Sequence, residues 1–410
     1  MRGRGAASVA GALVVGLVAG AAATIAVQGD AMEPDRLGPG PRAVEEVAGA
    51  ALRPDTFLAW TPNGLPTRFG RRVAALNGVA RSSVVAADNT WLVRSTTQSG
   101  EIADRPPAPY MVPIDAAAVD PRTFADFLPA ADRGVTVSLA RGEGILGTTS
   151  AELRGLGPGA TLTFDTGVKI RIAAVLPDEL VGAAELMVSR DTGHRIGVDT
   201  ERYVLLQPST PQPPTSAKLA RRLRELLPHT IEPPLRTVQV RAPGETPYLR
   251  QGDAVLPPVL LKSLFGEFAA LPKPNDPGFL LVDPAWVREQ IVTATVPVLG
   301  EVTCNRALIP QLRGAMRELA DEGLAHLIPE GQYNGCYVPR FANRVPTASI
   351  SHHTWGVAFD CNAASNPYGA KPQQDPRLVA ILRDWGFTWG GDWLVPDGNH
   401  FEYRRPAQSA

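Results

Sequence analysis

Two short stretches near the C-terminal end of the chain bring together histidines and aspartates at spacings that suit a metal. SISHHTWGVAFDCN contains His353 and Asp360, and DGNHFEY contains Asp397 and His400. A catalytic zinc takes three protein ligands from histidine and carboxylate and leaves one position open for water. His353, Asp360 and His400 meet that requirement, and zinc would lower the pKa of the water for peptide hydrolysis. We therefore expect one zinc ion on these three residues.

Strands must position these ligands. GVAFD alternates as a strand in which Ala358 and Asp360 share a face, and NHFEY alternates so that His400 and Glu402 share one. Pairing of the two strands would bring Asp360 and His400 together. Asp397, at the turn before the second strand, would then lie near the metal-bound water as a proton acceptor. Glu402 is either an acceptor that orients His400 or a surface carboxylate.

The two stretches resemble a known peptidase family. SHHTWGVAFD matches the pattern S-x-H-x-x-G-x-A-x-D, and DGNHFE matches D-x-x-H, of the zinc D-alanyl-D-alanine carboxypeptidase and L-alanyl-D-glutamate endopeptidase family. The resemblance covers roughly residues 255–410. It implies that His353, Asp360 and His400 are the zinc ligands and that Asp397 is the general base and acid. It also implies that the substrate is the peptidoglycan stem peptide, cut at either the D-Ala-D-Ala or the L-Ala-D-Glu bond.

The segment before the first ligand extends this resemblance. YNGCYVPRF resembles the family's segment at that place, which makes Arg340 the cation for a substrate carboxylate or a developing oxyanion. Ser351 either binds near the metal and the substrate or ends a strand. His352 precedes His353 directly, so either histidine could be aligned with the ligand position of the motif. His353 is the one that keeps the family's spacing to Asp360.

Other residues with reactive or aromatic side chains fit less specific roles. Trp389 and Trp393 either wall the cleft or pack in the core. Cys361 follows Asp360 on a strand and should point to the opposite face, which disfavours a Cys-His peptidase. No Ser-x-x-Lys motif occurs, which argues against a penicillin-binding-type serine peptidase. The remaining histidines have no partner at a recognised ligand spacing: His194, His229 and His326.

Size and charge limit the classes of function. A chain of 410 residues predicts two globular units, and 44% apolar with 20% charged residues is a globular balance. Forty basic against 41 acidic residues give a net charge of -1, so no overall field attracts nucleic acid. We expect no nucleic-acid partner.

The N-terminus and the cysteines indicate the compartment. MRGRG precedes an uncharged stretch over residues 6–27 that is long enough to span a bilayer. We expect an uncleaved anchor with the rest of the chain outside the cytoplasm, and a cleaved signal peptide with a secreted product is the alternative. Outside the cytoplasm a disulfide can form. Cys304 and Cys336 flank a helical segment and are the expected pair, with free buried thiols as the alternative.

The expected fold class is α+β throughout. We expect a signal anchor or signal peptide at 1–28, a linker at 29–56, a strand-rich α+β extracytoplasmic module at 57–240, a linker at 241–254, and a zinc peptidase domain at 255–410 with the metal held on an antiparallel sheet. Five runs in the module predict strands: 81–93, 134–140, 159–167, 168–178 and 202–208. Residues 119–132, 149–157 and 215–228 predict helices.

The strand-rich module carries a second resemblance. LGTTSAELRGLGPGATLTF and IAAVLPDELVGAAELMVS are similar to the extracytoplasmic domains of permeases related to lipoprotein exporters. This implies that residues 57–240 dock a membrane or envelope protein. A competing hypothesis follows, in which the protein is a non-catalytic, envelope-anchored binding or scaffolding protein with a degenerate peptidase fold. Intact metal ligands argue against that hypothesis.

Overall fold

The computed structural model describes residues 55–210, 214–243, 245 and 255–406. Among these residues no helix is both long and apolar enough to cross a membrane. The expected fold class is therefore corrected: the described part of the chain is a mixed α+β fold without a transmembrane anchor. The stretch 6–27, on which that expectation rested, lies outside the described residues, as do most of the two expected linkers.

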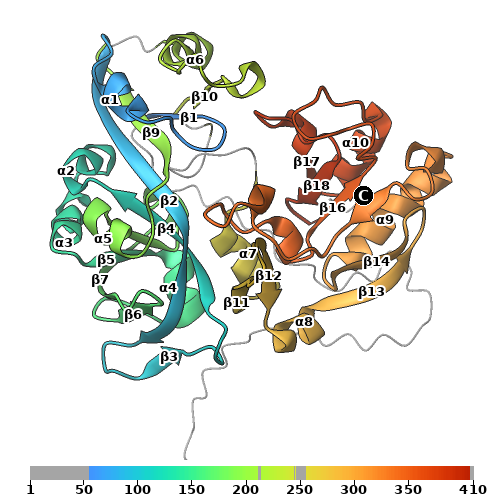
Figure 1. Cartoon of the computed structure of the whole chain (residues 1–410), viewed down its shortest axis with the longest axis horizontal. Coiled ribbons are helices and arrows are strands. Elements are labelled where there is room, and N and C mark those ends of the chain that lie inside the picture. Colours follow the sequence, from blue (N-terminus) through green and yellow to red (C-terminus); the bar gives the residue numbers. More distant parts are fainter. Residues whose placement is uncertain (1–54, 211–213, 244, 246–254, 407–410) are drawn as a thin grey trace, which may run out of the picture. The chain divides into compact units, whose positions relative to one another are not determined.

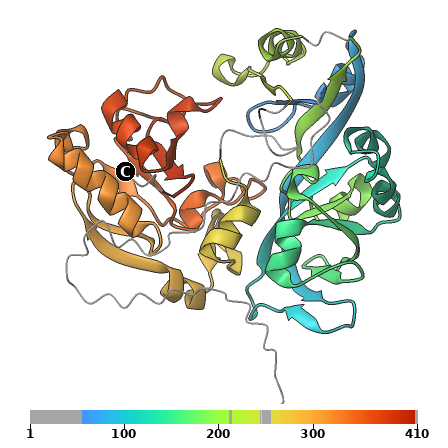
Figure 2. The same ribbon diagram turned by 180° about the vertical axis from the view of Figure 1, so that it is seen from behind.

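One ten-stranded sheet is built from the strands between Phe57 and Arg241. Nine of its strands follow the order β10-β1-β9-β2-β4-β8-β5-β7-β6, and β3 pairs with β2 beside them. The long strand β2 runs along this sheet in both views (Figure 1, Figure 2). The strands are β1 Phe57–Trp60, β2 Val79–Thr96, β3 Ile102–Asp104, β4 Val112–Val119, β5 Gly144–Gly147, β6 Thr161–Phe164, β7 Lys169–Leu176, β8 Leu186–Ser189, β9 Glu201–Pro208 and β10 Gln239–Arg241.

Short helices accompany this sheet, and one of them corrects an expected strand. They are α1 Phe69–Ala74, α2 Pro121–Phe124, α3 Thr136–Ala140, α4 Thr148–Arg154, α5 Arg190–Arg195 and α6 Ser216–Arg224. Residues 134–140 were expected to be extended, but most of them form α3. In this helix Thr136 and Leu139, three positions apart, are buried while Val137 is 53% exposed. The buried residues thus follow a helical spacing that the β-branched composition conceals.

The chain from residue 255 onward forms three smaller sheets. β11 Ala270–Lys273 pairs with β12 Asp276–Val282, and β13 Ile291–Val296 pairs with β14 Gly300–Asn305. The third sheet has the order β15-β16-β18-β17. Its strands are β15 Tyr333–Gly335, β16 Ala358–Cys361, β17 Phe387–Trp389 and β18 His400–Tyr403. The helices are α7 Pro258–Phe265, α8 Pro284–Gln290, α9 Ile309–Asp321 and α10 Pro376–Asp384.

Strand alternation fixes which face of this third sheet is polar. Phe359 of β16 and Phe401 of β18 are fully buried and stack with ring centroids 5.6 Å apart. They belong to the apolar core together with Trp355. Because neighbouring residues on a strand point to opposite faces, Asp360 and His400 project from the other face. The burial of the aromatic face therefore determines where the polar residues gather.

Candidate metal centre

The antiparallel pairing of β16 with β18 places Asp360 directly opposite His400. The same register sets Ala358 opposite Glu402, so these four side chains share one face of the sheet. Oδ1 of Asp360 lies 2.9 Å from Nδ1 of His400. The strand pairing expected from the sequence is confirmed.

His353 reaches the same place from a single 3-10 turn, η8 (His352–Thr354), ahead of β16. Its Nε2 atom lies 3.2 Å from Oδ1 of Asp360 and 3.2 Å from Nδ1 of His400. Between the turn and the strand, Gly356 has a φ of 66°, and a Cβ there would lie 2.7 Å from the amide nitrogen of Asn305. The glycine of the motif therefore permits both the backbone conformation and the close approach.

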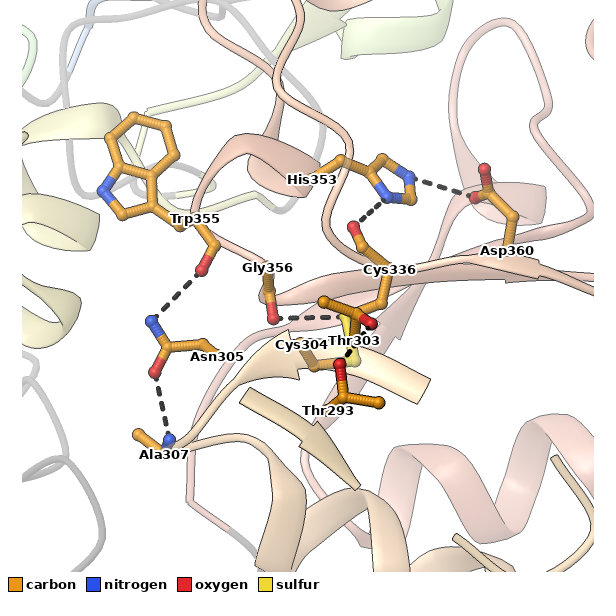
Figure 3. Close-up of a disulfide and its surroundings, with 10 residues drawn as sticks. All are labelled: Thr293, Thr303, Cys304, Asn305, Ala307, Cys336, His353, Trp355, Gly356 and Asp360. Atoms are coloured by element: carbon orange, nitrogen blue, oxygen red, sulfur yellow. Dashed lines mark hydrogen bonds and ion pairs between the residues drawn. A yellow bond between two sulfur atoms is a disulfide. The ribbon is translucent and has the colours of Figure 1, made fainter. Parts of the chain in front are cut away.

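A main-chain carbonyl orients the ring of His353. Nδ1 of His353 lies 2.8 Å from the carbonyl oxygen of Cys336 (Figure 3). A carbonyl only accepts, so Nδ1 carries the proton and the neutral ring turns the lone pair of Nε2 towards Asp360. Cys336 is also joined to Cys304 in a disulfide, as expected from the sequence. The sequence did not predict the role of this carbonyl, because main-chain atoms carry no residue signature.

A buried carboxylate orients the ring of His400 in a similar way. Oε2 of Glu402 lies 3.0 Å from Nε2 of His400 and 2.9 Å from Nδ1 of His352. Glu402 is only 3% exposed, so the surface role considered for it is excluded. Because Nε2 of His400 donates to Glu402, Nδ1 is the nitrogen left to bind a metal. His352 faces Glu402 and lies outside the group formed by the other three side chains.

The three ligand atoms have the spacing that a tetrahedral metal site needs. Nε2 of His353, Oδ1 of Asp360 and Nδ1 of His400 lie 2.9 to 3.2 Å from one another. Zinc with ligands at about 2.0 Å in tetrahedral geometry needs ligand atoms about 3.3 Å apart. The donor set, two imidazoles and a carboxylate, is also one that catalytic zinc uses. The residues therefore fit a zinc ion, and they could hold it with one position left open.

The charges in this group support the same assignment. Burial raises the pKa of Asp360, but its interactions with His353 and His400 outweigh burial and hold that pKa well below its usual value. Burial lowers the pKa of His353 below that of an exposed histidine. For His400, burial also lowers the pKa, but the hydrogen bonds to Asp360 and Glu402 prevail and raise it to about 10. Asp360 is thus an anion poised to attract a cation.

Asp397 lies at the turn before β18 and is half-buried. Nδ2 of Asn399 donates to its Oδ1 atom at 2.7 Å, and the amide of Asp397 donates to the carbonyl of Gly390 at 2.8 Å. Burial raises the pKa of the Asp397 carboxyl; His400 lowers it and the negative charge of Asp360 raises it. A carboxylate with a raised pKa is a better proton acceptor near neutral pH.

The backbone of Arg340 is fixed by hydrogen bonds, and its side chain is a candidate contact for the substrate. The hydroxyl of Thr354 lies 3.0 Å from both the amide nitrogen and the carbonyl oxygen of Arg340, and Ser351 donates its amide to the same carbonyl at 3.0 Å. Within the described residues, no hydrogen bond or ion pair engages the guanidinium. Burial lowers its pKa, and the charge of Asp360 raises it. The guanidinium is therefore available to an anionic substrate group.

The remaining candidates divide between the site and the core. The ring of Trp393 lies 5.1 Å from that of His400, so this tryptophan borders the site. Trp389 instead stacks on Phe401 and donates its indole N–H to Gly398 at 2.9 Å. Cys361 is a fully buried free thiol, as expected, and burial raises its pKa to about 12. His194 and His326 are exposed and do not approach the three ligand residues.

Comparison with known proteins gives one family match and several structural likenesses. Residues 345–403 match the family model described as D-alanyl-D-alanine carboxypeptidase. That segment includes Ser351, His353, Asp360, Asp397 and His400, whereas Arg340 precedes it. A search of curated proteins finds no match.

Three solved structures are similar at low identity. The periplasmic region of MacB from Actinobacillus actinomycetemcomitans has a TM-score of 0.31 at 13% identity, covering 47% of this chain and 90% of that one. The extracellular domain of the transporter YknZ from Gram-positive bacteria has a TM-score of 0.29 at 14% identity, covering 45% and 99%. A domain of a permease protein from Porphyromonas gingivalis has a TM-score of 0.29 at 13% identity, covering 49% and 93%.

By the family match, the C-terminal segment with the metal motifs is similar to D-alanyl-D-alanine carboxypeptidases, a peptidase family, as its paired motifs predict.

Proposed function

We propose that this protein is a zinc-dependent peptidase that hydrolyses peptide bonds of the peptidoglycan stem peptide, as a D-Ala-D-Ala carboxypeptidase or an L-Ala-D-Glu endopeptidase. The observation that carries the proposal is the arrangement of His353, Asp360 and His400. Their three ligand atoms lie within 4.8 Å of one another, and separate hydrogen bonds hold each ring with the metal-binding nitrogen turned inward. A degenerate site would have no reason to retain both the ligands and the groups that orient them.

The residues around the ligands suit each step of hydrolysis. A bound zinc ion would lower the pKa of a water molecule and polarise the substrate carbonyl. Asp397 would accept the proton of that water and pass it to the leaving amine, which its raised pKa favours. The guanidinium of Arg340 would pair with a substrate carboxylate or steady the developing oxyanion. Ser351, which precedes the 3-10 turn η8, would contact the substrate through its hydroxyl.

The experiment that tests this function uses the full chain and defined muropeptides, with and without a zinc chelator. Products are identified by mass spectrometry. Chelator-sensitive release of D-alanine would establish a carboxypeptidase, and chelator-sensitive internal cleavage would establish an endopeptidase. A protein that binds zinc but cuts no stem peptide would contradict the proposal and favour the non-catalytic binding protein.

The same proposal sets the compartment as the extracytoplasmic side of the cell envelope. The disulfide between Cys304 and Cys336 supports it, because disulfides form and persist in oxidising compartments. The stem peptide is present on that side of the membrane. The docking of an envelope protein by residues 57–240 stays a prediction, which a pull-down from membranes with the full chain would check.

A further inference from the structure

Residues 340–351 form a hairpin, here called the flap, whose two ends are the residues proposed to contact substrate. The flap leaves from Arg340 and returns to Ser351, two residues before the ligand His353. Three contacts close it: Ser351 N–H to the Arg340 carbonyl at 3.0 Å, the antiparallel bridge of Phe341 with Ile350, and Ala342 N–H to the Ser349 carbonyl at 2.9 Å. A shift of the flap would therefore move the proposed substrate contacts.

The tip of the flap packs against β12 and also reaches the ten-stranded sheet. Asn343 and Arg344 have φ angles of 53° and 57°, which non-glycine residues adopt at an energetic cost, and both are exposed. The guanidinium of Arg344 lies over the ring of Phe279, 5.1 Å from its centroid. The carbonyl of Thr347 accepts a hydrogen bond at 2.7 Å from Nη2 of Arg202, a residue of β9 in the ten-stranded sheet.

Arg202 is held rigidly before it meets the flap. Its Nε donates to the carbonyl of Ala87 and its Nη2 donates to Oδ1 of Asp88, both at 2.7 Å. Asp88 is 3% exposed, and its other oxygen accepts the amides of Asp199 at 2.9 Å and Thr200 at 2.7 Å. A guanidinium in such a fork loses little further freedom when it donates once more. Arg202 is thus a preorganised donor for the flap.

A second contact from the same sheet reaches the base of the flap. Phe341, which follows Arg340, is fully buried, and the ring of Trp91 in β2 packs edge-on against it with centroids 6.3 Å apart. Edge-to-face aromatic pairs of this kind add attraction beyond the area that they bury. The sheet therefore touches the flap at both its base and its tip.

Buried charges nearby indicate that the sheet and the second half of the chain are firmly joined. Nζ of Lys262, in α7, donates to Oε1 of Glu185 at 2.8 Å and to the carbonyl of Pro113 at 2.5 Å. Arg154 also pairs with Glu185, at 3.0 Å. The side chains of Lys262, Glu185 and Arg154 are each at most 1% exposed. Breaking such a pair would leave a buried charge uncompensated, which opposes separation of the two segments.

We propose that the ten-stranded sheet positions the peptidase site by holding the flap through Arg202 and Trp91, which makes both of them positioning residues for substrate binding. The kinetic part of this inference rests on the proposed peptidase function, and the structural part does not. With the Arg202 contact removed, the tip of the flap retains the Arg344 contact with Phe279 but loses its tie to the sheet. Arg340 and Ser351 then meet the substrate less often in the productive arrangement, whereas the metal ligands are unaffected.

The test compares Arg202→Met in the full chain with the wild type and with Arg190→Met. Arg190 is the matched control, because it lies in the same half, pairs with Glu201 at 2.5 Å and does not contact the flap. For Arg202→Met we expect KM for a stem peptide to rise about tenfold with kcat nearly unchanged, since binding would be lost uniformly. Hydrogen exchange at the amides of Ala342 and Ala348 should accelerate about tenfold. Arg190→Met should change neither quantity, and zinc content should be equal in all three proteins.

Unchanged flap exchange and unchanged KM in Arg202→Met would overturn the inference. If the amides of Asp199 and Thr200 also exchange rapidly, the sheet itself has loosened, and Trp91→Leu then decides by the same two readouts. A wild-type protein that cuts no stem peptide would refute the proposed function, but the exchange rates would still decide whether the sheet holds the flap. The two failures are therefore distinguishable.

Discussion

The carboxylate of Glu402 holds Nε2 of His400 at 3.0 Å, which leaves Nδ1 of His400 as the nitrogen that faces Asp360. One strand thus supplies both a ligand and, two residues later on the same face, the group that orients it. Glu402 also affects the strength of the ligand, because a negatively charged hydrogen-bond acceptor makes the imidazole a stronger electron donor to a metal.

Glu402→Gln should weaken zinc binding about tenfold or more, because the amide keeps the shape of the side chain but removes the charge that orients His400. Competition with a chromophoric chelator measures the affinity. Glu301→Gln is the matched control, since Glu301 is exposed on β14. Equal affinities in Glu402→Gln and the wild type would show that the carboxylate has no influence on the metal.

Asp397→Asn should lower kcat by about 10²–10⁴-fold while zinc content stays at one ion per chain. The reason is that the amide cannot accept the proton of the attacking water, although it retains the hydrogen bond from Asn399. Steady-state hydrolysis of a stem peptide and metal analysis of the same sample check the two parts. Asp384→Asn, at an exposed position of α10, should be fully active. Full turnover in Asp397→Asn would remove the proposed role of Asp397.

Zinc affinity should rise with pH. His400 in the metal-free chain has a pKa of about 10, so its ring must lose a proton before Nδ1 can bind zinc near neutral pH. The apparent affinity should increase about tenfold per pH unit between about pH 7 and about pH 9. Calorimetric titration in buffers of different ionisation enthalpy should report about one proton released. A flat pH profile would contradict the raised pKa of His400.

The stability of the metal-free protein should change with pH in the opposite direction. The pKa of His400 is raised on folding from about 6.5 to about 10. Its contribution to stability is therefore fully present below about pH 6.5 and is lost as the pH rises to about 10. Thermal unfolding of the metal-free chain at several pH values measures this, and His400→Gln should lose that part of the pH dependence.

Removal of the disulfide should weaken both the fold and the metal site. Cys304 and Cys336 are 32 residues apart, and closing a loop of that length contributes about 3–4 kcal/mol in the chain-entropy account. Cys304→Ala with Cys336→Ala should lose about that free energy of unfolding and bind zinc less tightly, because the Cys336 carbonyl orients His353. Denaturant unfolding and chelator competition measure the two effects. If the double variant matches the wild type in both, the bond has no part in building the site.

The strands of the site can be predicted from the sequence, because the alternation of side chains between the two faces of a strand is visible even in a segment of five residues. GVAFD and NHFEY alternate, and the spacing of the motif places Asp360 and His400 on facing strands. The contribution of the Cys336 carbonyl could not be predicted, because it depends on a tertiary contact of a main-chain atom. Residues 134–140 were misassigned for another reason: Val135 and Val137 favour a strand by composition, whereas tertiary packing selects a helix.

The contacts of the flap lie beyond sequence reasoning for a further reason. Arg202 and Thr347 are 145 residues apart, and no local pattern marks either as the other's partner. The same holds for Trp91 and Phe341. Local periodicity thus predicts elements, while contacts between distant elements depend on the whole fold.

The hydrogen bond between Nδ1 of His353 and the Cys336 carbonyl joins two closed loops of chain. The disulfide closes one loop, from Cys304 to Cys336, and a metal ion on His353 and His400 would close another across a separation of 47 residues. The second half of the chain would then carry two cross-links in series, one covalent and one coordinative. A displacement of β14 would be transmitted through the disulfide and one hydrogen bond to the ligand His353. The affinity for the ion would then depend on this part of the chain as well as on the three ligands.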